Sequence, residues 1–151
     1  MTTETIRAVA HFSDNTILKG TTQDFSPLRP LFHIQPAAGG APVEVRTKKL
    51  KALFVVKTFE GNRTRRDLAG FITGPSETAH GKKIAVHFKD GELLCGYTLS
   101  FTPDREGFFL FPSDHDSNNL RVYVVMAATR EVRAGPAADV LAKRVLDERP
   151  K

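Results

Sequence analysis

The chain has 151 residues and a net charge of +5 at neutral pH, and 40% of its residues are hydrophobic and 26% charged. These values are typical of a soluble domain that buries a core of its own, and they exclude a composition typical of a disordered chain. No run approaches the roughly 20 apolar residues that a membrane-spanning helix needs. The single cysteine, Cys95, excludes an internal disulfide and favours a reducing compartment. We therefore expect a cytoplasmic protein without a membrane partner.

Five segments rich in apolar residues predict five short strands in the first part of the chain, because most of them alternate as half-buried strands do. Between the first two strands, Asp14-Asn15 suits a tight turn, since Asn tolerates the positive φ that a type I′ turn requires. Pro27 and Pro30 must turn the chain before the third strand. The expected strands are 6–12, 16–25, 31–35, 43–47 and 50–57.

Residues 59–82 lose this alternation and predict a basic connector, in which Arg63, Arg65 and Arg66 form the densest basic cluster of the chain. A second set of strands follows. Gly135-Pro136 then ends the sheet, and Pro136 suits the first turn of a helix with an apolar stripe at Val140, Leu141, Val145 and Leu146. The expected elements are strands 83–88, 92–101, 107–111, 120–126 and 129–133, and a helix from 136 to about 148.

The second set of strands repeats the first. Residues 7–36 and 83–112 align without a gap and share eleven of thirty residues. Gly20 and Gly96 occupy one position of this repeat, where a missing side chain indicates a bulge or a sharp bend. The repeat predicts an all-β fold of two tandem five-stranded antiparallel barrels with a short C-terminal helix. The expected domains are a first barrel at 1–58, the connector at 59–82, a second barrel at 83–134, and the helix and tail at 135–151.

Phenylalanine supplies the expected core, because it has no polar group to keep at a surface. The chain contains eleven Phe, two Tyr and no Trp. Four of these Phe residues stand at matching positions of the repeat, so we expect their side chains inside: Phe12, Phe88, Phe25 and Phe101.

The segment IAVHFKDGELLCGYTLSF, with its Asp-Gly turn between two alternating strands, is similar to the first motif of Sm-like proteins of the Lsm and Hfq type. The order of the strands and turns resembles that small barrel over residues 6–57 and 83–133. The tandem form, with FFLFP after a Pro-x-Arg turn, also resembles an uncharacterised bacterial family of paired barrels. The resemblance implies that the protein is bacterial and that its domains are small barrels.

RNA binding does not follow directly from this resemblance. Sm proteins that bind RNA usually carry an Asp and an Asn near one turn and an Arg-Gly step between the last two strands. Residues 102–107 and 126–129 stand at these places without that pattern. The helix that usually begins Sm proteins is also missing, so a ring is not implied.

Several paired residues are candidates for binding. His11 and His87 either contact a phosphate, accept a proton near neutral pH, or pack across the sheet. Arg29 and Arg105 either bind an anion through their guanidinium groups, bond to loop carbonyls, or pair with a carboxylate. A basic surface for RNA or DNA would also draw on the connector arginines and on further cations of the chain. These further cations are Arg46, Lys48, Lys49, Lys51, Lys82 and Lys83.

No sequence pattern of a catalytic site is present, so an enzyme, a cofactor and a metal are not expected. The loop 113–119 carries oxygen and nitrogen ligands, but its spacing fits a polar turn better than a calcium loop. Cys95 is read as a small strand residue. Three function classes remain: a binding or regulatory module with a protein partner, nucleic-acid binding, and cyclic-dinucleotide sensing as in PilZ domains, for which Asp24-Phe25-Ser26 is a partial match.

Overall fold

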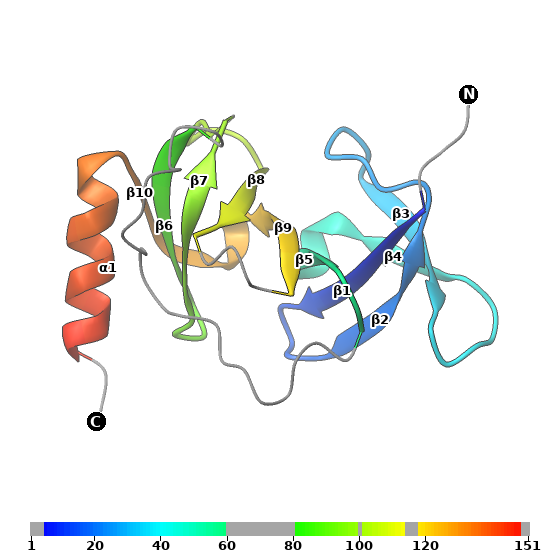
Figure 1. The fold of residues 1–151 in the computed structure, drawn as a ribbon. Helices are drawn as coiled ribbons and strands as arrows, with labels where there is room; N and C mark the ends of the chain where they lie inside the picture. The colour runs from blue at the N-terminus through cyan, green and yellow to red at the C-terminus, as the bar shows by residue number, and fades with distance from the viewer. Residues whose placement is uncertain (1–4, 60–80, 100, 114–117, 149–151) are drawn as a thin grey trace.

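A computed structural model describes residues 5–59, 81–99, 101–113 and 118–148. The described chain is mostly β structure with one C-terminal helix, as the sequence predicts (Figure 1). Two single 3₁₀ turns precede the fifth and tenth strands. The strands are β1 (Ile6–Phe12), β2 (Ile17–Thr22), β3 (Leu31–Pro36), β4 (Val43–Arg46), β5 (Leu50–Val56), β6 (Lys82–Phe88), β7 (Leu93–Thr98), β8 (Gly107–Pro112), β9 (Asn119–Val125) and β10 (Thr129–Ala134), the turns are η1 (Thr47–Lys49) and η3 (Met126–Ala128), and the helix is α1 (Pro136–Glu148).

The ten strands form one antiparallel sheet with the order β10-β6-β7-β8-β9-β5-β1-β2-β3-β4. The sheet is open, with β10 and β4 as its edges. The predicted arrangement of two separate five-stranded barrels is therefore not shown by the structure. The reason is that β5 of the first half pairs with β9 of the second half, which joins both halves in a single sheet.

The two halves of the sheet have the same strand order and the same register. Ala8 pairs with Gly20 and with Val55, and Ile84 pairs in the same way with Gly96 and with Ala134. A β-bulge also occurs at the same place in each half, where Lys51 of β5 and Arg130 of β10 have no partner in the ladder. The repeat in the sequence thus corresponds to a repeat in the pairing of the strands.

Both faces of β5 are buried, and every residue from Leu50 to Val56 lies in the interior. Ala52 and Phe54 pack with residues of the second half, whereas Leu53 packs in a cluster of the first half that also contains Tyr123 of β9. Strands buried on both faces are usually continuous apolar runs, and β5 has such a sequence apart from Lys51. Because each half completes the core of the other, the joint between them is part of the hydrophobic core.

Helix α1 covers β6 and β10 at one end of the sheet (Figure 1). Its buried residues are Ala138, Leu141, Ala142 and Val145, which recur with helical spacing and contact a patch containing Ala85 and Cys95. The predicted stripe was therefore partly wrong, because Val140 is 68% exposed and Leu146 lies at the surface. In the part of the chain that the structure describes, no helix is long and apolar enough to cross a membrane.

Gly20 and Gly96 allow a close approach of β2 to β3 and of β7 to β8. A Cβ atom on Gly20 would lie 2.1 Å from the carbonyl oxygen of Gln35, and one on Gly96 would lie 2.0 Å from that of Phe111. The sequence also allowed a β-bulge at these two glycines, but the bulges of the sheet occur at other positions. These two glycines are needed because no side chain fits between the paired strands.

The hairpin turns agree with the sequence prediction, since Asn15 has a φ of 75° and Gly91 a φ of 97°. The four phenylalanines expected inside differ in depth. Phe88 is fully buried, whereas the others are half-buried against the two larger apolar clusters. These half-buried residues are Phe12, Phe25 and Phe101.

Candidate functional site

Four of the predicted basic residues come together near β4. The backbone N–H of Thr47 donates to the carbonyl oxygen of Pro30 at 3.0 Å, which holds the loop before β3 against η1. This contact places the loop residue Arg29 near the end of β4 and near η1, where the other three cations lie. All four side chains are exposed: Arg29, Arg46, Lys48 and Lys49.

Arg105 occupies the matching loop of the second half, but it lacks such neighbours. The N–H of Met126 donates to the carbonyl oxygen of Glu106 at 2.8 Å, as Thr47 does to Pro30. In this half, however, the 3₁₀ turn is Met-Ala-Ala and contains no cation. Arg29 and Arg105 are therefore equivalent in the fold and lie in different electrostatic surroundings. Arg63, Arg65 and Arg66 lie outside the described residues.

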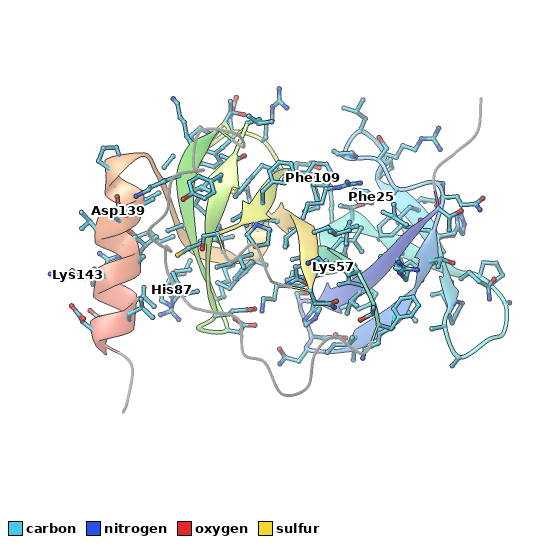
Figure 2. All side chains as sticks on the ribbon, viewed as in Figure 1. Phe25, Lys57, His87, Phe109, Asp139 and Lys143 are labelled. Atoms are coloured by element: carbon cyan, nitrogen blue, oxygen red, sulfur yellow. The ribbon has the colours of Figure 1, made fainter. Side chains whose placement is uncertain are left out.

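His11 and His87 also occupy equivalent positions with different surroundings. The ring of His11 lies 4.6 Å from the ring of Phe54, between centroids, so it packs across the sheet at the joint. Burial, together with the nearby charge of Lys51, lowers the pKa of His11 below its usual 6.5. His87 is half-buried and pairs across the sheet with Glu131, on the side of α1 (Figure 2). His11 therefore follows the packing interpretation.

An ion cluster that the sequence did not predict lies at the joint. Lys51, at the bulge of β5, reaches the hairpin turn of the second half. Its Nζ atom lies 2.7 Å from Oδ2 of Asp90, donates to the carboxylate of Glu92, and sits 4.7 Å from the centroid of the Phe88 ring. A single lysine within an otherwise apolar strand was the signal in the sequence.

The pKa values in this cluster reflect burial and ion pairing. Burial alone would lower the pKa of Lys51, but its hydrogen bonds to Asp90 and Glu92, together with the negative charges of these two groups, outweigh burial and raise the pKa above 10.5. For Asp90, burial acts upward, but the hydrogen bonds from Lys51 and from the N–H of Glu92, together with the nearby positive charge of Lys51, outweigh burial and lower the pKa below 3.8. Both groups are therefore charged at neutral pH.

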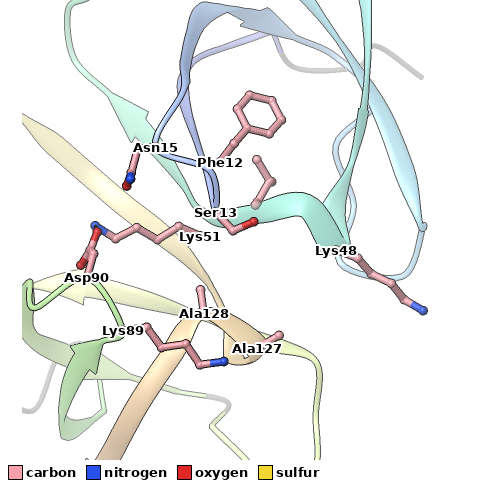
Figure 3. A pocket seen from close by; sticks show the side chains of 10 residues that line it. Phe12, Ser13, Asn15, Lys48, Lys51, Lys89, Asp90, Ala127 and Ala128 are labelled. Carbon is pink, nitrogen blue, oxygen red and sulfur yellow. Dashed lines mark ion pairs between the residues drawn. The ribbon is translucent and has the colours of Figure 1, made fainter.

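A cavity of about 300 Å³ lies beside this cluster, between the hairpins and 3₁₀ turns of the two halves (Figure 3). Lys51 extends across it toward Asp90, and Lys48 and Lys89 stand at its rim. An adjoining cavity of about 210 Å³ shares Lys48 and Ala127 with it and reaches Glu106. The joint therefore has hollows with cations at their edges, although Lys51 is already neutralised by the two carboxylates.

The two polar residues of the partial PilZ-like match, Asp24 and Ser26, form hydrogen bonds with residues of the same half. Asp24 accepts hydrogen bonds from the N–H of His33 at 2.9 Å and from the Thr22 hydroxyl at 3.1 Å, and its Oδ2 lies 2.8 Å from Nδ1 of His33. The Ser26 hydroxyl accepts from the N–H of Leu28 at 3.2 Å. Cyclic-dinucleotide binding stays a prediction.

The open edge of β4 is the other candidate surface. β4 pairs with β3 and, in the described residues, has no strand on its other side. Val43 is 39% exposed, and the side chains of Glu44 and Arg46 are 51% and 67% exposed. The loop 114–117, which contains most of the oxygen and nitrogen ligands noted above, lies outside the described residues, and no group of metal-ligating side chains occurs among the described ones.

Residues 4–135 match the model of a family of unknown function, DUF6982. The chain belongs to the DUF6982 family. The match spans all ten strands and ends before α1, so the sheet with its joint is the part that the family model covers. Searches of curated proteins and of solved structures found no significant match.

Within the DUF6982 match lie the Lys51 cluster, both cavities of the joint and the edge of β4. The exposed cations near β4 lie within it as well. The candidate binding surfaces therefore belong to the family region and not to the C-terminal helix.

Proposed function

We propose that the chain is a non-catalytic binding or regulatory module of a bacterial cytoplasm, and that a protein partner adds an extended segment to the open edge of β4. One observation carries this proposal. β9 holds the same place in the second half that β4 holds in the first, and the outer edge of β9 accepts β5 as an antiparallel strand. Within the described ranges, the same kind of edge at β4 has no strand paired to it, and strand addition to such an edge is a common mode of peptide recognition.

The opposite edge, β10, is less suited to a partner. At the positions where β5 has Ala52 and Phe54, β10 has Glu131 and Arg133, and charges on an edge strand oppose pairing. Arg144 of α1 pairs with Glu131, which ties the helix to this strand. The helix also covers the face of β6 next to it. This end of the sheet is therefore protected, whereas no described residue pairs with the outer edge of β4.

The side chains of β4 define the partner strand. Val45 points into the core, and Glu44 and Arg46 are exposed on the other face. A complementary segment would place a cation opposite Glu44, an anion opposite Arg46 and an apolar residue opposite Val43. We expect an extended segment with alternating charge on one face.

A nucleic acid is the second candidate, because exposed cations flank the same edge. Arg29, Arg46, Lys48 and Lys49 come from neighbouring elements, and phosphate binding by such a group weakens steeply with salt. Acidic Glu44 lies among them, which favours the protein partner. Salt-titrated binding to mixed RNA and DNA oligomers separates the two candidates.

Photo-crosslinking tests the proposal. A photoreactive amino acid replaces Glu44 in full-length protein inside cells, and the same residue at the exposed Lys143 of α1 serves as the control. We expect one protein to be attached at position 44 only, and the attachment to be lost in the Arg46→Glu variant. Attachment of nucleic acid, or of the same proteins at both positions, would contradict the proposal.

We also propose that each half is one small barrel of the Sm-like kind, duplicated within the chain. The equal strand order and register of the halves support the duplication. The domain boundaries given above remain part of this proposal. An experimentally determined structure in which the two halves do not superpose on each other would overturn it.

A further inference from the structure

We propose that a third cavity of the joint, lined by Phe109 and Arg121 of the second half and by Gln23 and Phe25 of the first, binds a phosphate linked through a sugar to a planar base. This unit occurs both in a free nucleotide and in single-stranded nucleic acid. The cavity measures about 340 Å³ and shares no residue with β4 or with the two cavities described above. Its full lining is Ile6, Thr22, Gln23, Phe25, Pro27, Phe109 and Arg121.

Arg121 is the first reason for this proposal. Its side chain is half-buried in the cavity wall, and its Cζ atom lies 5.6 Å from the centroid of the Phe109 ring. Among the described residues it has no carboxylate within ion-pair distance, unlike Lys51, Arg133 and Arg144. A guanidinium stacked on an aromatic ring keeps its N–H donors in the plane of the fork, where they bind a phosphate through two hydrogen bonds.

The aromatic wall is the second reason. Phe25 lies 6.2 Å from Phe109 and 5.3 Å from Tyr123, between ring centroids, and Phe109 lies 5.3 Å from Tyr123. Figure 2 shows Phe25 and Phe109 on facing sides of the joint. These rings pack edge to face and leave no gap for a further ring between them. A ligand ring would therefore stack on the outer face of the Arg121 guanidinium or on the exposed part of Phe25.

Polar residues also line the cavity, as a specific ligand-binding site requires. Gln23 is exposed at the rim and donates from Nε2 to the Thr5 hydroxyl at 2.8 Å, which fixes the direction of its carboxamide. The volume lies in the lower range of small-ligand pockets, which suits a single nucleotide. An arginine, two aromatic rings and a fixed carboxamide together favour a nucleotide over a purely apolar ligand.

The test titrates the full-length protein with adenosine monophosphate, adenosine, inorganic phosphate and a short single-stranded RNA oligomer, by calorimetry and by amide NMR. We expect the monophosphate to bind more tightly than adenosine or phosphate, with shifts centred on Gln23, Phe109 and Arg121. Tighter binding of the oligomer with a steep salt dependence would assign the site to a strand. Equal or weaker binding of the oligomer would assign it to a free nucleotide.

Matched variants decide whether Arg121 carries the binding. The Arg121→Gln variant should bind the monophosphate about 10-fold more weakly, since it loses a charge-assisted pair of hydrogen bonds. Arg130 is an exposed strand arginine, and the one hydrogen bond of its guanidinium among the described residues goes to the carbonyl oxygen of Lys89, so Arg130→Gln should bind as the wild type does. Unchanged binding by Arg121→Gln, shifts centred on Lys48 and Lys49, or no binding at millimolar concentration would overturn the proposal. Crosslinking at position 44 does not depend on this result.

Discussion

Lys51 carries a positive charge into the joint between the two halves, where only 10% of its side chain is exposed. A buried charge is tolerated when it is paired, and its removal leaves the partner charges without compensation. Asp90 and Glu92 are the partners, and both are more exposed than Lys51. We therefore expect the contribution of this cluster to the free energy of unfolding to lie between that of a surface ion pair and that of a fully buried ion pair.

We predict that Lys51→Met lowers the free energy of unfolding by about 2 kcal/mol, because two carboxylates lose their cation while the buried chain stays apolar. Arg130→Met is the matched control, since Arg130 holds the equivalent bulge position and pairs with no carboxylate of the described residues. It should change stability by less than about 0.5 kcal/mol. Urea unfolding of both variants checks this, and equal losses would contradict the role of the ion pair.

The same cluster predicts a loss of stability in acid. Because the pKa of Asp90 in the folded protein lies below its ordinary 3.8, its contribution is fully present above that pH and is lost as the pH falls through the lowered value. His11 acts in the same direction at higher pH, starting near 6.5, because its pKa is also lowered. In Lys51→Met the loss below pH 3.8 should be smaller than in the wild type. Parallel acid unfolding curves would argue against this assignment.

At the residue scale, the sequence predicted the conformation of the turns better than the contacts of individual side chains. Asn15 and Gly91 were predictable because the positive φ of a tight hairpin limits the residue type. The partners of Lys51 were not, because they depend on which strands of the two halves meet. The repeat correctly predicted that Arg29 and Arg105 occupy equivalent positions. It did not predict their different neighbours, because these depend on the residues of the two 3₁₀ turns.

Among the elements, the close pairs β2–β3 and β7–β8 depend on a glycine in each half. We predict that Gly20→Ala and Gly96→Ala each destabilise the protein by about 2 kcal/mol or more, since the added Cβ would meet a backbone carbonyl. The equivalence of the halves predicts similar losses for both variants. Thermal unfolding checks this, and a neutral effect at either position would show that the strands separate easily.

Helix α1 stabilises the β10 end by covering Ala85 and Cys95. Leu141→Ala should cost about 2 to 4 kcal/mol, because Leu141 is fully buried, and should make Cys95 react faster with a thiol reagent. Val140→Ala is the control on the exposed face and should change neither quantity appreciably. A Cys95 that reacts equally fast in all three proteins would contradict the covering role of the helix.

The elements themselves were largely predictable. All ten strands and the helix were expected near their observed positions, because alternation, prolines and the Asp-led turns mark their limits. The helix face was less certain, since Val140 and Leu146 are as apolar as the residues that are buried. Only the position of α1 on β6 and β10 decides which of them faces the sheet.

For the whole molecule, the sequence indicated a repeat but not how its copies meet. The continuous apolar run of β5 fits a strand buried on both faces, yet nothing in the pattern identifies β9 as its partner. Pairing across the joint places the strands of both halves in one sheet. It also leaves β4 as the edge for a partner, which is the basis of the proposed function.

Native-state hydrogen exchange tests this arrangement most directly. If the joint unites the halves, the amides of β5 and β9 should exchange only through global unfolding, and strands of both halves should share one free energy of opening. The outward amides of β4 should exchange much faster, because in the described residues no strand covers them. Two distinct opening free energies, one for each half, or slow exchange along the outer edge of β4 in the isolated protein, would contradict the account.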